Sequence, residues 1–131
     1  MSGLAERIVA AARDLLGVRF RLQGHSAERG LDCVGLTQLV LARAGHGVAA
    51  PREYGLRFGD EWRARSWLAG AGLKPADDAR PGDIALVRPG PLQLHLMIVV
   101  PGGHVHAHAG LGRVVETPGA SPWPVIGHWR I

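Results

Sequence analysis

Apolar residues in the first third of the chain recur every three or four positions, which is the spacing of one helix face. The first such segment runs from Leu4 to Leu16, with Ser2 as its predicted N-cap and Gly17 as its end. Charged residues stand among the apolar ones, so this segment predicts an amphipathic helix and not the uncharged core of a signal peptide. We therefore expect a chain made in the cytosol that does not leave by the general secretory route.

A second helix is predicted after a glycine-rich, loop-like stretch over 17–31. Asp32 is a suitable N-cap for this helix, and Gly45 is a natural terminator. Gly35 lies in its first turn, although glycine costs about 1 kcal/mol there relative to Ala. We expect another group to pack closely against that turn. A third helix is predicted over 60–71.

From Arg80 onward the pattern changes to short β-rich runs separated by Pro-Gly and Gly-Gly pairs. The predicted strands span 84–88, 95–100, 104–108, 113–117 and 125–130. Helices followed by a meander of strands are typical of an α+β fold with an antiparallel sheet. The chain has 131 residues and shows no repeat or linker, so residues 1–131 are predicted to form one domain.

Composition and charge narrow the classes of function. The formal net charge is +4, but the basic residues are scattered and form no stripe, so a nucleic-acid partner is not expected. The longest apolar run, over 96–101, is too short to cross a membrane. The single cysteine excludes an internal disulfide framework and a Cys-rich zinc site.

That cysteine, Cys33, directly follows the predicted N-cap of the second helix. Unpaired backbone N–H groups and the positive end of the helix dipole favour thiolate there, so we expect a pKa below the free-thiol value of about 8.5. Such a thiolate is a nucleophile if a base is near, and the Cys33 N–H can stabilise an oxyanion. The alternative is a small buried hydrophobic side chain.

Four histidines are candidates for the base. His104, His106 and His108 alternate along one predicted strand and therefore share a face. If this strand forms a hairpin with the preceding one through a two-residue turn, His95 falls on the same face, opposite or diagonal to His106 and His108. Two imidazoles so placed suit a base and its orienting partner. One alternative is an exposed polar face that is rich in histidine. The other is a metal site, and the scarcity of nearby carboxylates is evidence against it.

Several other polar and aromatic residues are interpreted as ordinary surface or packing groups. Solvated positions are expected for His25, His46, His128, Glu116, Arg19 and Arg21. Arg19 and Arg21 lie in the loop before Cys33, and the alternative for them is contact with a substrate carboxylate. The tryptophans are expected to pack in the core or at its rim rather than to line a glycan groove, namely Trp62, Trp67, Trp123 and Trp129.

Five blocks of the sequence, taken in order, resemble the NlpC-type papain-like cysteine peptidases, which cut bacterial cell-wall peptides. The blocks are GVRFRLQG, DCVGL, RPGDIALV, HLMIVV and VHAHAGLGRVVET. They correspond in turn to the family's Gly-x-Pro-Tyr-x-x-Gly-Gly loop, its Asp-Cys-Ser-Gly-Leu nucleophile motif, its Pro-Gly-Asp-Leu turn and strand, its His-Val-Gly-Ile-Tyr strand and its Ile-His-Ala strand. The resemblance covers nearly the whole chain and implies a papain-like fold with N-terminal helices packed on a C-terminal antiparallel sheet.

The resemblance also implies roles for individual residues. Cys33 is the expected nucleophile, His95 the general base and His106 the third polar residue. The resemblance favours His106 over His108, whereas spacing alone does not separate the two. Asp32 corresponds to the family's structural acid beside the nucleophile. The residues expected on the substrate side are Phe20, Arg21, Asp32 and His108. The family pattern implies neither a metal nor a cofactor.

Three positions depart from the family pattern. Phe20 stands where the family has Tyr, Gln23 replaces the first Gly of a pair, and Met97 replaces a small residue two positions after the base. These departures leave the triad intact and change the expected substrate pocket.

The activity implied by the resemblance is hydrolysis of an amide in the peptide stem of peptidoglycan, favouring the bond from γ-D-glutamate to a diamino acid. The chain looks most like the small peptidases of phage tails and gene transfer agents, so tail proteins are expected partners and the cell wall the expected place of action. A secreted amidase effector is the nearest variant. Two alternatives are a non-catalytic adaptor of a tail assembly and amide hydrolysis or acyl transfer on lipid or protein substrates.

Overall fold

The computed structural model describes residues 3–47 and 60–131, and the predicted N-cap residue Ser2 lies outside them. The helices are α1 (Leu4–Asp14), α2 (Cys33–Arg43) and α3 (Glu61–Gly70). The strands are β1 (His25–Ser26), β2 (Gly30–Leu31), β3 (Lys74–Ala76), β4 (Ile84–Gly90), β5 (Gln93–Val100), β6 (Gly103–His108), β7 (Arg113–Pro118) and β8 (Val125–Arg130). Within these residues no helix is both long and apolar enough to cross a membrane.

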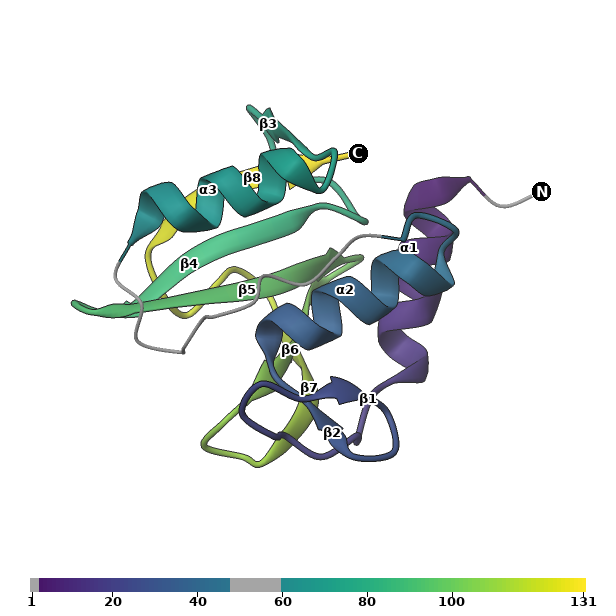
Figure 1. The fold of residues 1–131 in the computed structure, drawn as a ribbon. Coiled ribbons are helices and arrows are strands. Elements are labelled where there is room, and N and C mark those ends of the chain that lie inside the picture. Colours follow the sequence, from purple (N-terminus) through teal and green to yellow (C-terminus); the bar gives the residue numbers. More distant parts are fainter. Residues whose placement is uncertain (1–2, 48–59) are drawn as a thin grey trace.

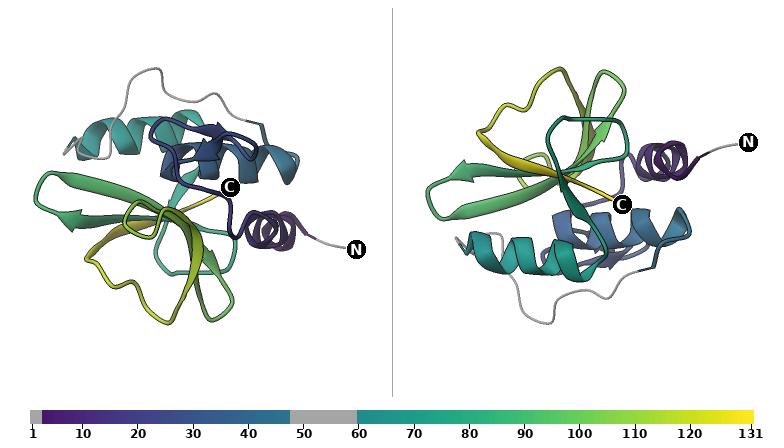
Figure 2. Two further views of the ribbon diagram at one scale, coloured as in Figure 1. Left: turned by 90° about the horizontal axis from the view of Figure 1, so that it is seen from below. Right: turned by 90° about the horizontal axis from the view of Figure 1, so that it is seen from above.

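Six strands form one antiparallel sheet in the order β3-β8-β4-β5-β6-β7, and β1 and β2 form a separate small hairpin (Figure 1). Helices α2 and α3 lie together on one side of the large sheet, and α1 stands beside α2 (Figure 2). The predicted α+β fold and its five strands are confirmed. The sequence pattern missed the two-residue strands β1 and β2, which lie in the stretch predicted as loop. It also missed β3, a short strand of exposed and half-exposed residues that includes a proline and pairs with β8.

The helix boundaries follow from capping. Asp32 accepts a hydrogen bond from the backbone N–H of Gly35 at 2.8 Å, and Asp60 accepts one from Arg63 at 3.1 Å, so both carboxylates cap helices. Gly45 follows α2 with a φ of +95°, which confirms it as the terminator. The N-cap of α1 is Gly3 and not the predicted Ser2, and it contributes no side-chain bond. The helix ends at Asp14, before the predicted end at Gly17.

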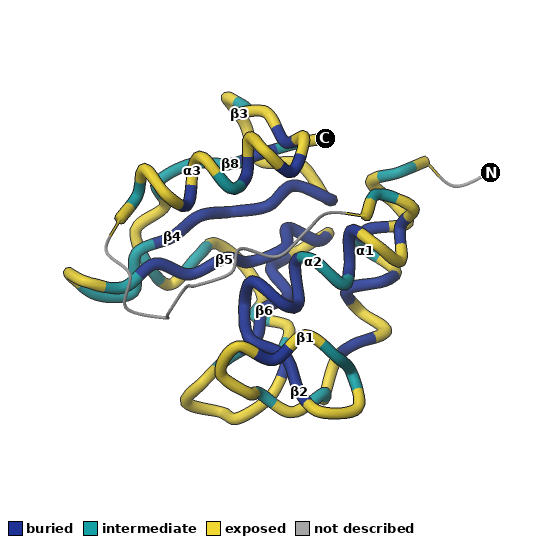
Figure 3. The backbone as a smooth tube through the Cα atoms, viewed as in Figure 1, coloured by how far each residue is buried: buried dark blue, intermediate teal, exposed yellow. Residues whose placement is uncertain are grey.

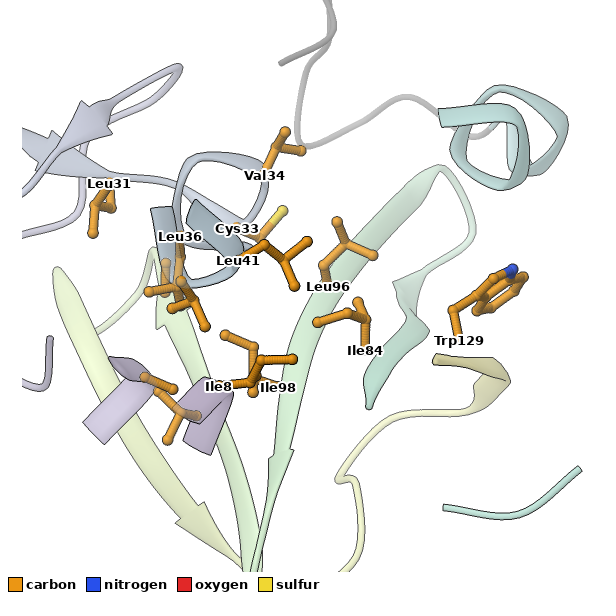
Figure 4. Close-up of a cluster of buried hydrophobic side chains, with 14 of the residues drawn as sticks. Ile8, Leu31, Cys33, Val34, Leu36, Leu41, Ile84, Leu96, Ile98 and Trp129 are labelled. Carbon is orange, nitrogen blue, oxygen red and sulfur yellow. The ribbon is translucent and has the colours of Figure 1, made fainter. Parts of the chain in front are cut away.

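The main core fills the space between the helices and the sheet, and buried residues concentrate along the central strands (Figure 3). Figure 4 shows part of this cluster, in which side chains of α1 and α2 meet those of β4 and β5. A second, smaller cluster lies on the opposite face of the sheet, where Ala85, Val87, Met97 and Val99 pack with Trp123. Because both faces are covered, β5 is apolar almost throughout and does not alternate with polar residues.

The RPGD motif forms a buried ionic junction. The Asp83 side chain is 1% exposed and accepts a hydrogen bond from the backbone N–H of Arg80. It also accepts hydrogen bonds from Nε and from a terminal nitrogen of Arg130, each at 2.8 Å. A buried carboxylate needs such partners. This junction ties the turn before β4 to the end of β8.

The β5–β6 hairpin has the predicted two-residue turn, since Val100 pairs with Gly103 across Pro101 and Gly102. Pairing between the strands stops at Ile98 and Val105. Beyond that point β5 and β6 diverge (Figure 1). The opening between them lies beside the first residues of β5.

Three predictions about exposure are wrong, those for His46, His128 and Trp62, and His128 is half-buried in β8. His46 is half-buried, and its Nε2 makes a 2.8 Å hydrogen bond with the carbonyl oxygen of Ala71, which ties the residues after α2 to the end of α3. Trp62 is 74% exposed and is not a packing residue, whereas Trp129 is buried in the core. Glu116 is exposed as predicted and forms an ion pair with Arg13.

The first turn of α2 packs directly on the loop that precedes it. A Cβ atom at Gly35 would collide with the carbonyl oxygen of Gly24 and lie 3.2 Å from the Cα of His25. The close packing expected from Gly35 is therefore confirmed, and the obstruction is backbone that cannot rotate away.

We expect Gly35→Ala to destabilise the fold. Overpacking costs up to about 3 kcal/mol, and the gain in helix propensity is about 1 kcal/mol, so the free energy of unfolding should fall by about 2 kcal/mol in urea denaturation. Gly70→Ala is the matched control, because Gly70 is also helical and has nothing within 4 Å of its added Cβ. Equal stability of the two variants would contradict the packing argument.

Candidate active site

Cys33 is the first residue of α2, and its side chain is only 3% exposed. Its sulfur lies between α2 and β5, on the side of Leu96 (Figure 4). The backbones of Leu96, Val34 and Cys33 itself act on the thiol by lowering its pKa. As predicted from the N-cap at Asp32, Cys33 lies in the first turn of the helix.

The protonation state of Cys33 differs from the sequence prediction. Burial, followed by the negative charge of Asp32, raises the pKa of the thiol to about 12, and the backbone N–H groups lower it by less. The prediction of a pKa below that of a free thiol is therefore wrong for the free protein. Removal of water from the sulfur outweighs the field of the helix N-terminus.

His95 on β5 and His106 on β6 form a hydrogen-bonded chain that ends at Thr117 on β7. His95 Nε2 lies 3.0 Å from His106 Nδ1, and His106 Nε2 lies 2.8 Å from the hydroxyl oxygen of Thr117. His95 is 7% and His106 1% exposed. His108 Nδ1 accepts a hydrogen bond from the backbone N–H of Leu111 instead, so the partner of His95 is His106.

Both imidazoles of this pair are neutral at neutral pH. Burial, followed by the charges that His106 and His108 would carry, lowers the pKa of His95 to about 3. Burial also lowers the pKa of His106 to about 4, with contributions from His108 and His104. A neutral imidazole has a lone pair on one ring nitrogen, so the pair can accept a proton.

Trp123 covers the histidine pair. Its ring meets those of His95 and His106 edge-on, with centroids 5.6 Å apart and planes at 89° in both cases. Trp123 also lines a cavity of about 130 Å³ beside His95. The cavity takes residues from both faces of the sheet, such as Leu94 and His108, because β5 and β6 diverge here.

The residues predicted for the substrate side fall into two groups. His108 lines the cavity, and its role with substrate stays a prediction. Phe20 packs against the main core, and Arg21 is exposed, but neither lines this cavity. Asp32 is fully buried and accepts from the backbone N–H groups of Gln23 and Gly35, so it is a structural residue and not a substrate contact.

His95 and His106 are hydrogen-bonded to each other, whereas among the described residues neither ring is hydrogen-bonded to the Cys33 thiol. In the described part of the chain, no hydrogen bond links the Cys33 sulfur to a nitrogen of His95. The pKa of the thiol is lowered by the backbone of Leu96, the residue that follows His95 in β5. The free protein therefore has a neutral thiol and a neutral imidazole that no hydrogen bond joins.

Sequence reasoning missed Thr117 and the position of Trp123. Thr117 pairs with His104 across β6 and β7, so it lies diagonal to His106 on the same face. Extending the hairpin argument by one strand would have found it. Trp123 precedes β8 in a turn region, where no periodicity assigns a direction to the side chain.

The described residues contain no group of three or more His, Cys, Asp or Glu side chains placed to hold a metal ion. Alternation puts His104, His106 and His108 on one face, but their nitrogens have other partners or surroundings. Nδ1 of His104 is buried with no hydrogen-bond partner in that part of the chain.

Known proteins share this fold at low sequence identity. No family model and no curated protein matches the chain. The peptidoglycan hydrolase RipB of Mycobacterium tuberculosis is 21% identical to this chain, with a TM-score of 0.65. The match covers 96% of this chain and 63% of the RipB chain. The P60 domain of antigen MAP1204 from M. avium subspecies paratuberculosis is 25% identical with a TM-score of 0.62, covering 96% of this chain and 92% of that one.

A third similar structure separates the fold from the activity. RipD of M. tuberculosis, described as a non-catalytic NlpC/p60 domain protein adapted to peptidoglycan binding, is 17% identical with a TM-score of 0.65. The match covers 98% of this chain and 97% of RipD. These likenesses support the family resemblance seen in the sequence, and they show that the chain has the papain-like NlpC/P60 fold.

Proposed function

We propose that this chain is a cysteine peptidase that hydrolyses an amide in the peptide stem of peptidoglycan. The observation that carries the proposal is the buried, hydrogen-bonded pair of His95 and His106, next along β5 to Leu96, whose backbone lowers the pKa of the Cys33 thiol. The fold shared with a peptidoglycan hydrolase supports the class of substrate.

The mechanism begins from a neutral thiol and a neutral imidazole. His95 takes the Cys33 proton as the sulfur attacks the amide carbonyl, so the charged pair forms only along the reaction, as it does for a serine–histidine pair. The backbone N–H of Cys33, at the helix start, helps to hold the developing oxyanion. His95 then protonates the leaving amine, and water, deprotonated by His95, releases the acyl group.

The cavity beside His95 fits the amine side of the scissile bond. His95 delivers the proton to the leaving nitrogen, so the residue that departs lies on the His95 side of the sulfur. The walls of this cavity are mostly apolar. Gln93 and His108 also line it and offer hydrogen-bonding groups to a polar amino acid. We take that residue to be the diamino acid of the stem and the acyl side to be γ-D-glutamate.

In the cell, we propose that the chain acts on the wall as a component of a phage-tail or gene-transfer-agent particle. This proposal rests on the resemblance of the sequence to small tail-module peptidases. Proteomic analysis of purified particles from the host should find the chain in the tail fraction. Finding it only in the soluble fraction of lysed cells would contradict the proposal.

A second candidate function is a non-catalytic adaptor, in a tail assembly, that uses the same fold. The observation that favours it is the burial of Cys33, whose thiol lacks a hydrogen bond to His95 in the described structure. RipD shows that an NlpC/p60 domain can be non-catalytic. Tight binding to sacculi or to a tail protein, without turnover, would support this candidate.

Purified protein should shorten muropeptides at one amide bond. Cys33→Ala removes the nucleophile and His95→Ala the base, so each should lower the rate by at least about 100-fold while circular dichroism shows the parent fold. Products are identified by mass spectrometry.

His128→Ala is the matched control for this experiment. His128 is a half-buried strand histidine outside the cavity, so its variant should cleave at the parent rate. Cleavage by Cys33→Ala at the parent rate would overturn the peptidase proposal.

The reactivity of Cys33 in the free protein should depend steeply on pH. With its pKa raised to about 12, the rate of alkylation by iodoacetamide should rise roughly ten-fold per pH unit from pH 7 to pH 10. In urea the rate for the same thiol should level off above its ordinary pKa of about 8.5. A plateau near pH 7 in the folded protein would show that burial does not control this thiol.

A further inference from the structure

We propose that Thr117 is a positioning residue that sets the proton on His106 and thereby keeps His95 competent as a base. The proposal rests on the proposed function and extends the catalytic chain by one residue. The 2.8 Å contact between the Thr117 hydroxyl oxygen and His106 Nε2 carries it, together with the 3.0 Å contact between the two histidines.

The direction of these two hydrogen bonds decides whether His95 can act. His95 Nε2 contacts His106, so Nδ1 is the nitrogen left to take the thiol proton. Neutral His95 must then have its hydrogen on Nε2 and donate it to His106 Nδ1. His106 in turn has its hydrogen on Nε2 and donates it to the Thr117 oxygen.

The opposite direction would inactivate the base. If His106 had its hydrogen on Nδ1, it would donate to His95 Nε2, and neutral His95 would be protonated on Nδ1. That nitrogen would have no lone pair for the Cys33 proton. The chain therefore needs an acceptor at the far side of His106.

Thr117 is the group that supplies this acceptor. His106 is 1% exposed, so water has little access to its ring, and a buried N–H without a partner is unfavourable. Thr117 is half-buried, which leaves room for its own hydroxyl hydrogen to turn toward solvent while the oxygen accepts.

The fold holds Thr117 at this distance. Thr117 pairs with His104 and Val115 with His106, so the hydroxyl approaches His106 diagonally across β6 and β7. A Cβ at Gly103 would collide with the carbonyl oxygen of Thr117, so the two backbones approach closely here. Thr117 is thus set by the strand ladder and not by a mobile loop.

The arrangement also bears on the charge that forms during the reaction. When His95 takes the thiol proton, its Nε2–H bond to His106 strengthens, because the donor is then charged. His106 is a neutral acceptor, unlike the carboxylate of many catalytic triads. The Thr117 oxygen polarises His106 in the direction that helps, since it accepts from the far nitrogen.

The test compares Thr117→Val with Thr117→Ser. Valine keeps the shape and removes the oxygen, and serine restores it. On a muropeptide substrate, Thr117→Val should lower kcat by about ten-fold or more with little change in KM, as happens when an outer partner of a functional histidine is removed. Thr117→Ser should stay within a few-fold of the parent.

A second readout does not depend on cleavage. Nitrogen-15 NMR of the histidine side chains should show His106 protonated on Nε2 in the parent and in Thr117→Ser. In Thr117→Val the population should shift toward Nδ1–H, and His95 should change tautomer with it.

The outcomes separate this proposal from the proposed function. An unchanged kcat together with unchanged tautomers in Thr117→Val would overturn the role of Thr117 and leave the peptidase proposal intact. Absence of cleavage by the parent protein would overturn the peptidase proposal, and the NMR comparison alone would then decide whether Thr117 sets the proton on His106.

Discussion

The buried carboxylate of Asp32 joins the loop before α2 to the first turn of that helix, and the candidate site depends on this junction. One oxygen accepts from Gly35 in the helix and the other from Gln23 in the loop, both at 2.8 Å. The absence of a side chain at Gly35 lets the Gly24 backbone approach. Cys33 lies between Asp32 and Gly35 in the chain, so this junction fixes the backbone that carries it.

The second constraint is the divergence of β5 and β6 after three paired positions. While the strands are paired, side chains of opposite faces are separated by the sheet. Where pairing stops, residues of both faces line one cavity, and the start of α2 comes near the strand that holds His95. A catalytic arrangement that combines a helix start with a sheet face requires such an opening.

Burial has opposite effects on the two halves of the site. It keeps the thiol protonated and the imidazoles neutral, which disfavours a resting ion pair. The same dry surroundings strengthen each hydrogen bond in the chain from His95 to Thr117. The active form of the proposed peptidase is therefore a neutral set of groups that becomes charged only as the substrate reacts.

The sequence by itself determined the start of α2, five of the six strands in the large sheet, the two-residue turn and the shared face of His95 and His106. Each of these follows from local chemistry, namely capping residues, alternation and a turn of fixed length. Tertiary structure alone decided the protonation of Cys33, the hydrogen bond from the His95 ring to His106, and the places of Thr117 and Trp123. Those depend on how much water the assembled layers exclude and on which side chains they bring within 3 Å, which no short stretch of sequence contains.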